Sequence, residues 1–104
     1  MLLSASPDVV VTLSRYVGMV GDVVRADVVV EAHPDNRKVE LIWDNACFGS
    51  SVVDVEPTQR LRFSRNTRLD TAGTCVVFVV LTRTGGKTIY SAKKTVEVVG
   101  DNMP

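Results

Sequence analysis

The amino-acid sequence predicts an all-β fold, a single domain built as an antiparallel β-sandwich of about seven short strands. Three observations lead to this prediction. About a fifth of the 104 residues are valine, and β-branched side chains favour strands over helices. Apolar and polar residues alternate with a period of two in several runs. Turn residues separate these runs, and no helical pattern is present for parallel crossovers.

The alternation is clearest in two of the runs. In the run 39–44, Val39, Leu41 and Trp43 fall on one face, which makes Trp43 the expected core anchor. In the run 24–32 the even positions are apolar, whereas the charged side chains point the other way. Both patterns are typical of strands with one buried face.

The expected strands follow one another with turn signals between them. Gly18 and Gly21 flank the expected turn between the first two strands, and Gly85–Gly86 predicts a two-residue hairpin turn. Lys93–Lys94 interrupts the alternation of the last strand, so we expect a bulge or bend there. In chain order, the seven expected strands are Val9–Leu13, Val24–Ala32, Val39–Asp44, Ser51–Val55, Arg60–Ser64, Thr74–Leu81 and Thr88–Val99.

Length and charge limit the classes of function. We expect one domain over residues 1–104, with its core in 9–99 and flexible ends at 1–7 and 100–104. Twelve basic residues balance twelve acidic ones, which argues against binding to nucleic acid or to an anionic membrane surface. No apolar run approaches the ~18 residues that span a bilayer, so no membrane insertion is expected.

The candidates for chemistry are weak. His33 and Asp35 share a turn, but two side chains do not complete a four-ligand metal site. Gly86-Lys87-Thr88 resembles the end of a phosphate loop, although Leu81 stands where the motif needs glycine. The basic cluster is interpreted as a solvated strand face and loop because it lacks a series of interleaved stacking aromatics and the chain is neutral overall; its members are Arg60, Arg62, Arg65 and Arg68. We therefore predict no catalytic residue, metal site or cofactor.

The order of landmarks resembles an immunoglobulin-like domain or its fibronectin-III-like relatives, of a bacterial or viral type. A glycine opens the second strand at Gly21, and the single tryptophan, Trp43, lies in the third. The run 69–77 resembles the corner that opens the sixth strand of such domains. Cys75 stands at the position of the family's tyrosine and Val77 at that of its second cysteine. The chain therefore departs from the family's tyrosine corner and standard disulfide.

The resemblance implies a different place for a disulfide. In such a sandwich the third and sixth strands are antiparallel neighbours, so Cys47, just after the third strand, would lie beside Cys75 at the start of the sixth. The alternative is a pair of reduced, buried cysteines that act as small apolar residues. A disulfide would agree with export to the extracellular space or cell envelope. A cytoplasmic protein is the alternative.

The same corner places an apolar stripe on the outside of the sandwich. If the odd residues of 75–81 face the core, then Val76, Phe78 and Val80 face outward beside Ile42. An apolar stripe on an outward face is typical of a surface that a partner buries, here another protein, a neighbouring domain or a second copy. The alternative is that the chain covers the stripe itself, through a loop or through Tyr90 and Lys93.

The sequence therefore predicts a non-enzymatic binding, adhesion or spacer module of an exported protein. Its contacts are expected from the outward stripe and from the turns at His33–Asn36 and Gly85–Gly86. The alternative is a small accessory subunit that docks an envelope enzyme complex through the sheet of the third and sixth strands. An enzyme with its site on the loops is a third hypothesis, which the short loops disfavour.

Overall fold

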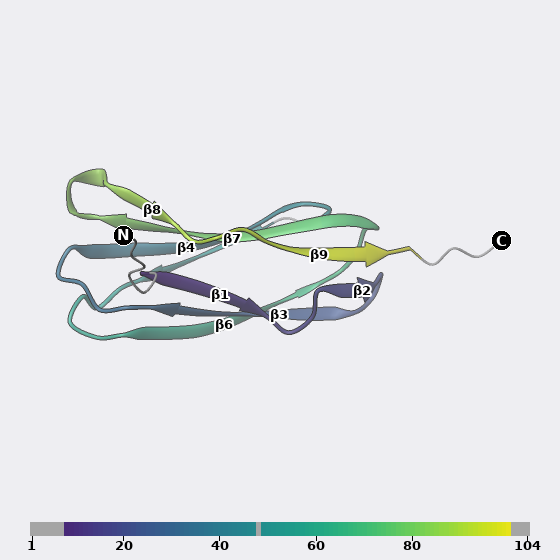
Figure 1. Ribbon diagram of the computed structural model, residues 1–104, viewed down its shortest axis with the longest axis horizontal. Coiled ribbons are helices and arrows are strands. Elements are labelled where there is room, and N and C mark those ends of the chain that lie inside the picture. The colour runs from purple at the N-terminus through teal and green to yellow at the C-terminus, as the bar shows by residue number, and fades with distance from the viewer. Residues whose placement is uncertain (1–7, 48, 101–104) are drawn as a thin grey trace, which may run out of the picture.

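Two β-sheets, antiparallel except for the β2–β9 pair of the larger one, pack face to face in the computed structural model, which describes residues 8–47 and 49–100 (Figure 1). The predicted all-β sandwich is confirmed. A short 3-10 turn, Thr84–Gly86, is the one helical element in the described residues. The strands are β1 Val9–Leu13, β2 Val17–Met19, β3 Val23–Val30, β4 Asn36–Asn45, β5 Gly49–Asp54, β6 Leu61–Arg68, β7 Gly73–Arg83, β8 Thr88–Tyr90 and β9 Lys94–Val99.

The strand order explains how the chain builds the two layers. The smaller sheet has the order β1-β3-β6, and the larger has the order β2-β9-β7-β4-β5, with β8 also paired to β7. As predicted, the tryptophan strand β4 and the strand β7 are antiparallel neighbours. β5 pairs with β4 rather than with β6. The larger sheet is therefore centred on β4 and β7.

The core lies between the inner faces of the two sheets and follows the predicted alternation. Val39 and Leu41 are fully buried, and Trp43 is 4% exposed. The even residues of β3 are buried in the same way, opposite the odd residues of β7. Leu61 and Phe63 on β6 point inward but are only half-buried, because β6 is an edge strand. Alternation thus identified the inner faces correctly.

Two of the expected strands differ from those observed. The turn between the first two strands was expected to be flanked by Gly18 and Gly21, but Gly18 lies inside β2, which pairs in parallel with β9, and the turn follows at residues 20–21. The expected last strand, 88–99, is two strands, β8 and β9, separated at residues 91–93. The break includes Lys93, so it overlaps the bulge or bend predicted at Lys93–Lys94.

The sandwich is elongated, with extents of 55 × 33 × 20 Å. β1 starts in the half of the long axis that holds the Thr84–Gly86 turn, and β9 finishes near the other end (Figure 1). The expectation of flexible ends falls on residues 1–7 and 101–104, outside the described part, except for Gly100. Among the described residues, no helix has the length and apolar character to cross a bilayer.

Candidate functional site

Two turns that were predicted separately meet at one end of the sandwich. The backbone N–H of Thr84, in the turn between β7 and β8, donates to the carbonyl of Asp35, in the turn between β3 and β4, at 2.8 Å. The N–H of His33 donates to the carbonyl of Pro57 at 3.2 Å, which ties the β5–β6 loop to the same group. We call the surface formed by residues 33–37 and 84–87 the loop pole.

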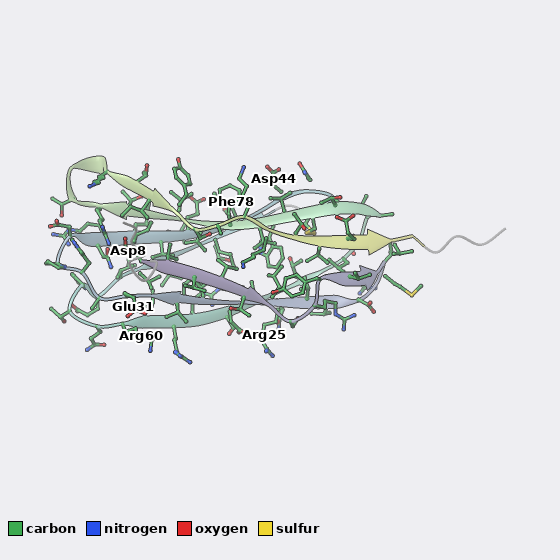
Figure 2. All side chains as sticks on the ribbon, viewed as in Figure 1. Asp8, Arg25, Glu31, Asp44, Arg60 and Phe78 are labelled. Carbon is green, nitrogen blue, oxygen red and sulfur yellow. A yellow bond between two sulfur atoms is a disulfide. The ribbon has the colours of Figure 1, made fainter. Side chains whose placement is uncertain are left out.

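A buried arginine lies beneath the loop pole. Nε of Arg83 donates to Oδ1 of Asn36 at 3.0 Å, and the Asn36 amide donates in turn to the carbonyl of Glu31 at 3.0 Å. Asn36 is fully buried and Arg83 is 9% exposed. Nη2 of Arg83 lies 3.3 Å from Oδ1 of Asp8, an ion pair without an aligned hydrogen bond. Figure 2 labels Asp8 and Glu31 at this end.

The sequence interpretation missed this arginine. Arg83 lies two residues after Leu81 and so has the parity of the core-facing residues of β7. This parity could have predicted that Arg83 is buried. A charged group at such a position requires partners, because an unpaired buried charge is costly. Asn36 and Asp8 supply them from elements far away in the chain. The network therefore joins the start of β1 to both turns of the loop pole.

The outer surface of the loop pole is polar and carries both signs of charge. Pro34, Asp35, Arg37 and Lys87 are exposed. Arg37 is held in place because its Nη1 donates to the carbonyls of Pro34 at 2.9 Å and Asn36 at 2.8 Å. Gly85 and Gly86 both have φ near 81°, a conformation that favours glycine. His33 has a local role, since its Nδ1 accepts the Asp35 N–H at 3.1 Å.

The predicted apolar stripe lies on the outward face of the larger sheet. Ile42 is paired with Phe78, and Val80 with Tyr90, across neighbouring strands. All four stripe residues, Ile42, Val76, Phe78 and Val80, are half-buried. Nζ of Lys93 lies 5.4 Å from the centre of the Phe78 ring, so the lysine covers part of the stripe. Figure 2 shows Phe78 on this outer side.

Two more exposed apolar residues extend the stripe sideways. Val52 on β5 is 54% exposed and Tyr90 on β8 is 63% exposed. Both lie in the cross-strand row of Glu40 and Val80. The stripe is therefore half-covered along β7, whereas its two flanks are open.

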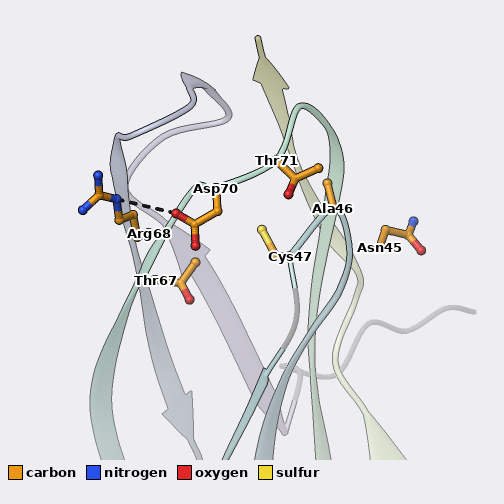
Figure 3. Close-up of a pocket in the computed structure, with 7 residues that line it drawn as sticks. All are labelled: Asn45, Ala46, Cys47, Thr67, Arg68, Asp70 and Thr71. Atoms are coloured by element: carbon orange, nitrogen blue, oxygen red, sulfur yellow. Dashed lines mark ion pairs between the residues drawn. The ribbon is translucent and has the colours of Figure 1, made fainter. Parts of the chain in front are cut away.

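Cys47 and Cys75 form a disulfide bond, with 5.1 Å between their Cα atoms. It joins the loop after β4 to the start of β7, within one sheet, at the end opposite the loop pole. Beside it lies a hollow of about 420 Å³ (Figure 3), in which Arg68 and Asp70 form an ion pair at 3.6 Å. Its lining residues are Asn45, Ala46, Cys47, Thr67, Arg68, Asp70 and Thr71. The one sulfur in this lining is oxidised, so it supplies no nucleophile.

The arginine cluster does not form a continuous cationic track. Arg60 pairs with Glu31 at 3.1 Å, and Arg68 pairs with Asp70. The Arg65 guanidinium lies 5.1 Å from the centre of the Phe63 ring. These contacts agree with the interpretation of a solvated strand face. In the part of the chain that the structure describes, no three His, Cys, Asp or Glu side chains are grouped to hold a metal ion.

Comparison with known proteins supports the fold. No protein-family model and no curated protein sequence matches the chain. A solved structure that does match is the CARDB domain of the PF1109 protein from Pyrococcus furiosus, described as a complex with di-metal ions. The TM-score is 0.61 at 16% sequence identity, and the match covers 91% of this chain and 96% of that chain. The chain thus has the immunoglobulin-like β-sandwich fold, as its sequence predicted.

Proposed function

We propose that the chain is a non-enzymatic immunoglobulin-like module of an exported protein and that it binds a protein partner through the loop pole. One observation carries the proposal: two turns about 50 residues apart are hydrogen-bonded to each other above the buried pair of Arg83 and Asn36. Binding residues are commonly found on loops that a rigid scaffold positions. Here the sandwich supplies the scaffold and the arginine network fixes the loops to it.

The chemistry of the loop pole favours a polar protein surface as its partner. Arg37 and Lys87 can donate to carboxylates and carbonyls, and the exposed Asp35 can accept from a partner's cations. Gly85 and Gly86 have no side chains, so a partner backbone can approach this turn closely. Mixed charges of this kind contribute more to specificity and association rate than to affinity.

Export is supported by the disulfide. Structural disulfides persist in oxidising compartments and are rare in the cytosol. The disulfide of Cys47 and Cys75 lies in a domain of 104 residues, a size class in which such bonds add appreciably to stability. A thiol count on unfolded protein purified without reductant should find no free thiols. Two free thiols would remove this support.

Site-specific photo-crosslinking tests the binding surface. A photoreactive amino acid at Pro34 or Lys87 should capture a partner protein from an extract of the secreted and envelope fractions. The same group at Val17, which is 62% exposed at the far end of the sandwich, should not. Capture should also disappear when excess unmodified chain competes. Equal capture from both ends of the molecule would contradict the proposal.

The second candidate is an accessory subunit that docks an envelope enzyme complex through the larger sheet. The observation that favours it is the exposure of Val52 and Tyr90 on either side of the stripe, because open apolar area is what a docking partner buries. A photoreactive group at Tyr90 distinguishes the two candidates. Capture from Tyr90 and not from Pro34 would favour the docking subunit.

A further inference from the structure

The edges of the two sheets are protected to different degrees. An open edge offers unpaired N–H and C=O groups to other strands, so proteins commonly shorten or charge it. On one side of the sandwich the chain passes from one sheet into the other, which leaves β1 with five residues and β2 with three. On the other side, β6 is long but carries charge, and its arginines are Arg62, Arg65 and Arg68.

β5 lacks these protections. It has six residues, Gly49–Asp54, and its one charged side chain is Asp54 at the end. No other strand among residues 8–47 and 49–100 pairs with its outer side. Its central outward side chain, Val52, is 54% exposed. β5 is therefore an unpaired edge strand with a single charged residue, and its central residue, Val52, is exposed.

We propose that a second copy of the chain pairs with this edge, with β5 antiparallel to β5 across a two-fold axis beside Val52. Residues opposite each other in an antiparallel pair lie on the same face, so the axis must pass beside a single residue. Centred on Val52, the pairing sets Val52 against Val52 and Ser50 against Asp54. The valines bury each other, and a hydroxyl faces a carboxylate.

The charges of the edges favour β5 over β6 for self-pairing. The one charged residue of β5, Asp54, lies opposite Lys38 within its own chain, and no like charges meet across the proposed axis. Self-pairing of β6 about Arg65 would set Arg65 against itself and Arg62 against Arg68. Like charges directly opposite are destabilising. The arginines of β6 therefore oppose self-pairing at the β6 edge, whereas no such charges oppose it at the β5 edge.

The two-fold arrangement has a consequence for binding. An axis perpendicular to the sheet reverses the strand direction, so the loop poles of the two copies point in opposite directions. A dimer of this kind can bridge two partners, and avidity then multiplies a modest single-site affinity. The dimer goes beyond the proposed function and does not depend on it.

Light scattering coupled to size exclusion, at several concentrations and without reductant, tests the dimer. The parent chain should shift from monomer to dimer as concentration rises. Val52→Glu should raise the dimer dissociation constant more than tenfold, because two carboxylates would meet at the axis. Val17→Glu is the matched control: both valines are exposed and each lies opposite a glutamate, Glu40 for Val52 and Glu97 for Val17.

Engineered cysteines test the register and remain informative if Val52→Glu fails to fold. Directly opposed residues have Cβ atoms about 5 Å apart, so Val52→Cys should form a crosslinked dimer on mild oxidation. Ser50→Cys should not, because its two copies would lie about 13 Å apart. The native cysteines are already paired. A monomer at every concentration, a dimer insensitive to Val52→Glu, or crosslinking at residue 50 and not at 52 would overturn the proposal.

Discussion

A single buried arginine joins the ends of three strands, β1, β4 and β7. Arg83 ends the otherwise apolar inward row of β7, and its guanidinium reaches Asn36 on β4 and Asp8 just before β1. Removing one partner from such a group leaves a desolvated donor, whereas removing both can be nearly neutral. The energetic value of the network is therefore best measured by comparing single and double substitutions.

Asn36→Ala should destabilise the fold by about 2 kcal/mol, because it leaves Nε of Arg83 and the Glu31 carbonyl without partners. The double variant Asn36→Ala with Arg83→Met should lose less than the sum of the single variants, since no buried charge remains. Urea unfolding followed by fluorescence of Trp43 measures both. Asn66→Ala, on an exposed position of β6, serves as the control and should change stability by under about 0.5 kcal/mol. Additive losses would contradict a coupled network.

Asp27 gives the fold a small dependence on acid. The hydrogen bond from Ser64 lowers the pKa of the Asp27 carboxyl below its ordinary value of 3.8, Arg25 and Arg62 lower this pKa further, and partial burial opposes them. A carboxyl whose pKa is lower in the folded state stabilises the fold above its unfolded pKa. That stability is lost as the pH falls through the folded pKa, so the affected window lies below about pH 4.

Asp27→Asn should therefore reduce the loss of stability between about pH 6 and pH 3, by under about 1 kcal/mol because the side chain is 40% exposed. Urea midpoints at the two pH values measure the difference. Ser64→Ala should have a similar effect, since it removes the hydroxyl that lowers the pKa. If both variants lost as much stability in acid as the parent, the hydrogen bond would not be responsible.

Among the elements, strands with one buried face were predictable and those fixed by distant partners were not. A one-residue slip would turn the inner face of β4 outward, so its alternation is strongly constrained. β2 has no such pattern, because Val17 and Met19 are both exposed around Gly18. Its place is set by pairing with β9, about 80 residues later. Local sequence therefore does not reveal it.

The break between β8 and β9 is explained by Ser91, whereas the sequence analysis had pointed to Lys93–Lys94. The hydroxyl of Ser91 accepts the N–H of Val79 at 2.9 Å, so a side chain replaces a backbone carbonyl in the ladder. The same hydroxyl donates to the carbonyl of Ala92 at 3.1 Å. Lys93–Lys94 marked the neighbourhood because two charged residues in sequence break the alternation. Ser91, whose hydrogen bond with Val79 follows the end of β8, does not break the alternation and so could not be recognised from the sequence.

The candidate site was predictable to a similar degree. Parity alone placed the stripe residues on the outward side of the larger sheet, although their role as a partner face stays a prediction. The two turns of the loop pole were recognised from glycine and proline signals. Their contact through Thr84 and Asp35 was not, because it depends on strand order rather than on local sequence.

Gly18 shows how closely β2 is fitted to the core. A Cβ at this position would lie 2.8 Å from Cδ1 of Leu69, which is fully buried. Gly18→Ala should therefore destabilise the fold by about 1–2 kcal/mol through overpacking, although alanine is the less flexible residue. Thermal unfolding measures the change. Val17→Thr, at the exposed neighbouring position, is the control and should change stability by under about 0.5 kcal/mol. An equal loss of stability in both variants would contradict overpacking as the cause.

At the scale of the whole molecule, the fold separates the loop pole from the disulfide. The loop pole joins two turns and is hydrogen-bonded to the β5–β6 loop, whereas the disulfide joins the loop after β4 to β7 near the other end of the long axis. A domain of this size buries a limited core. Closing a loop with a sequence separation of 28 residues reduces the entropy of the unfolded chain. The disulfide is thus expected to stabilise the entire sandwich and not only its own end.

The double variant Cys47→Ser with Cys75→Ser should lower the free energy of unfolding by on the order of 3 kcal/mol, which is what the chain-entropy model assigns to a loop of this length. Urea unfolding of the parent, with and without reductant, gives an independent value that should agree. The loop pole lies at the opposite end, so its capture of a partner at low temperature should persist in the variant. An unchanged unfolding midpoint in the double variant would mean that the disulfide does not stabilise the fold. A loss of partner capture in a still-folded variant would mean that the two ends are coupled through β4 and β7, the strands that run between them.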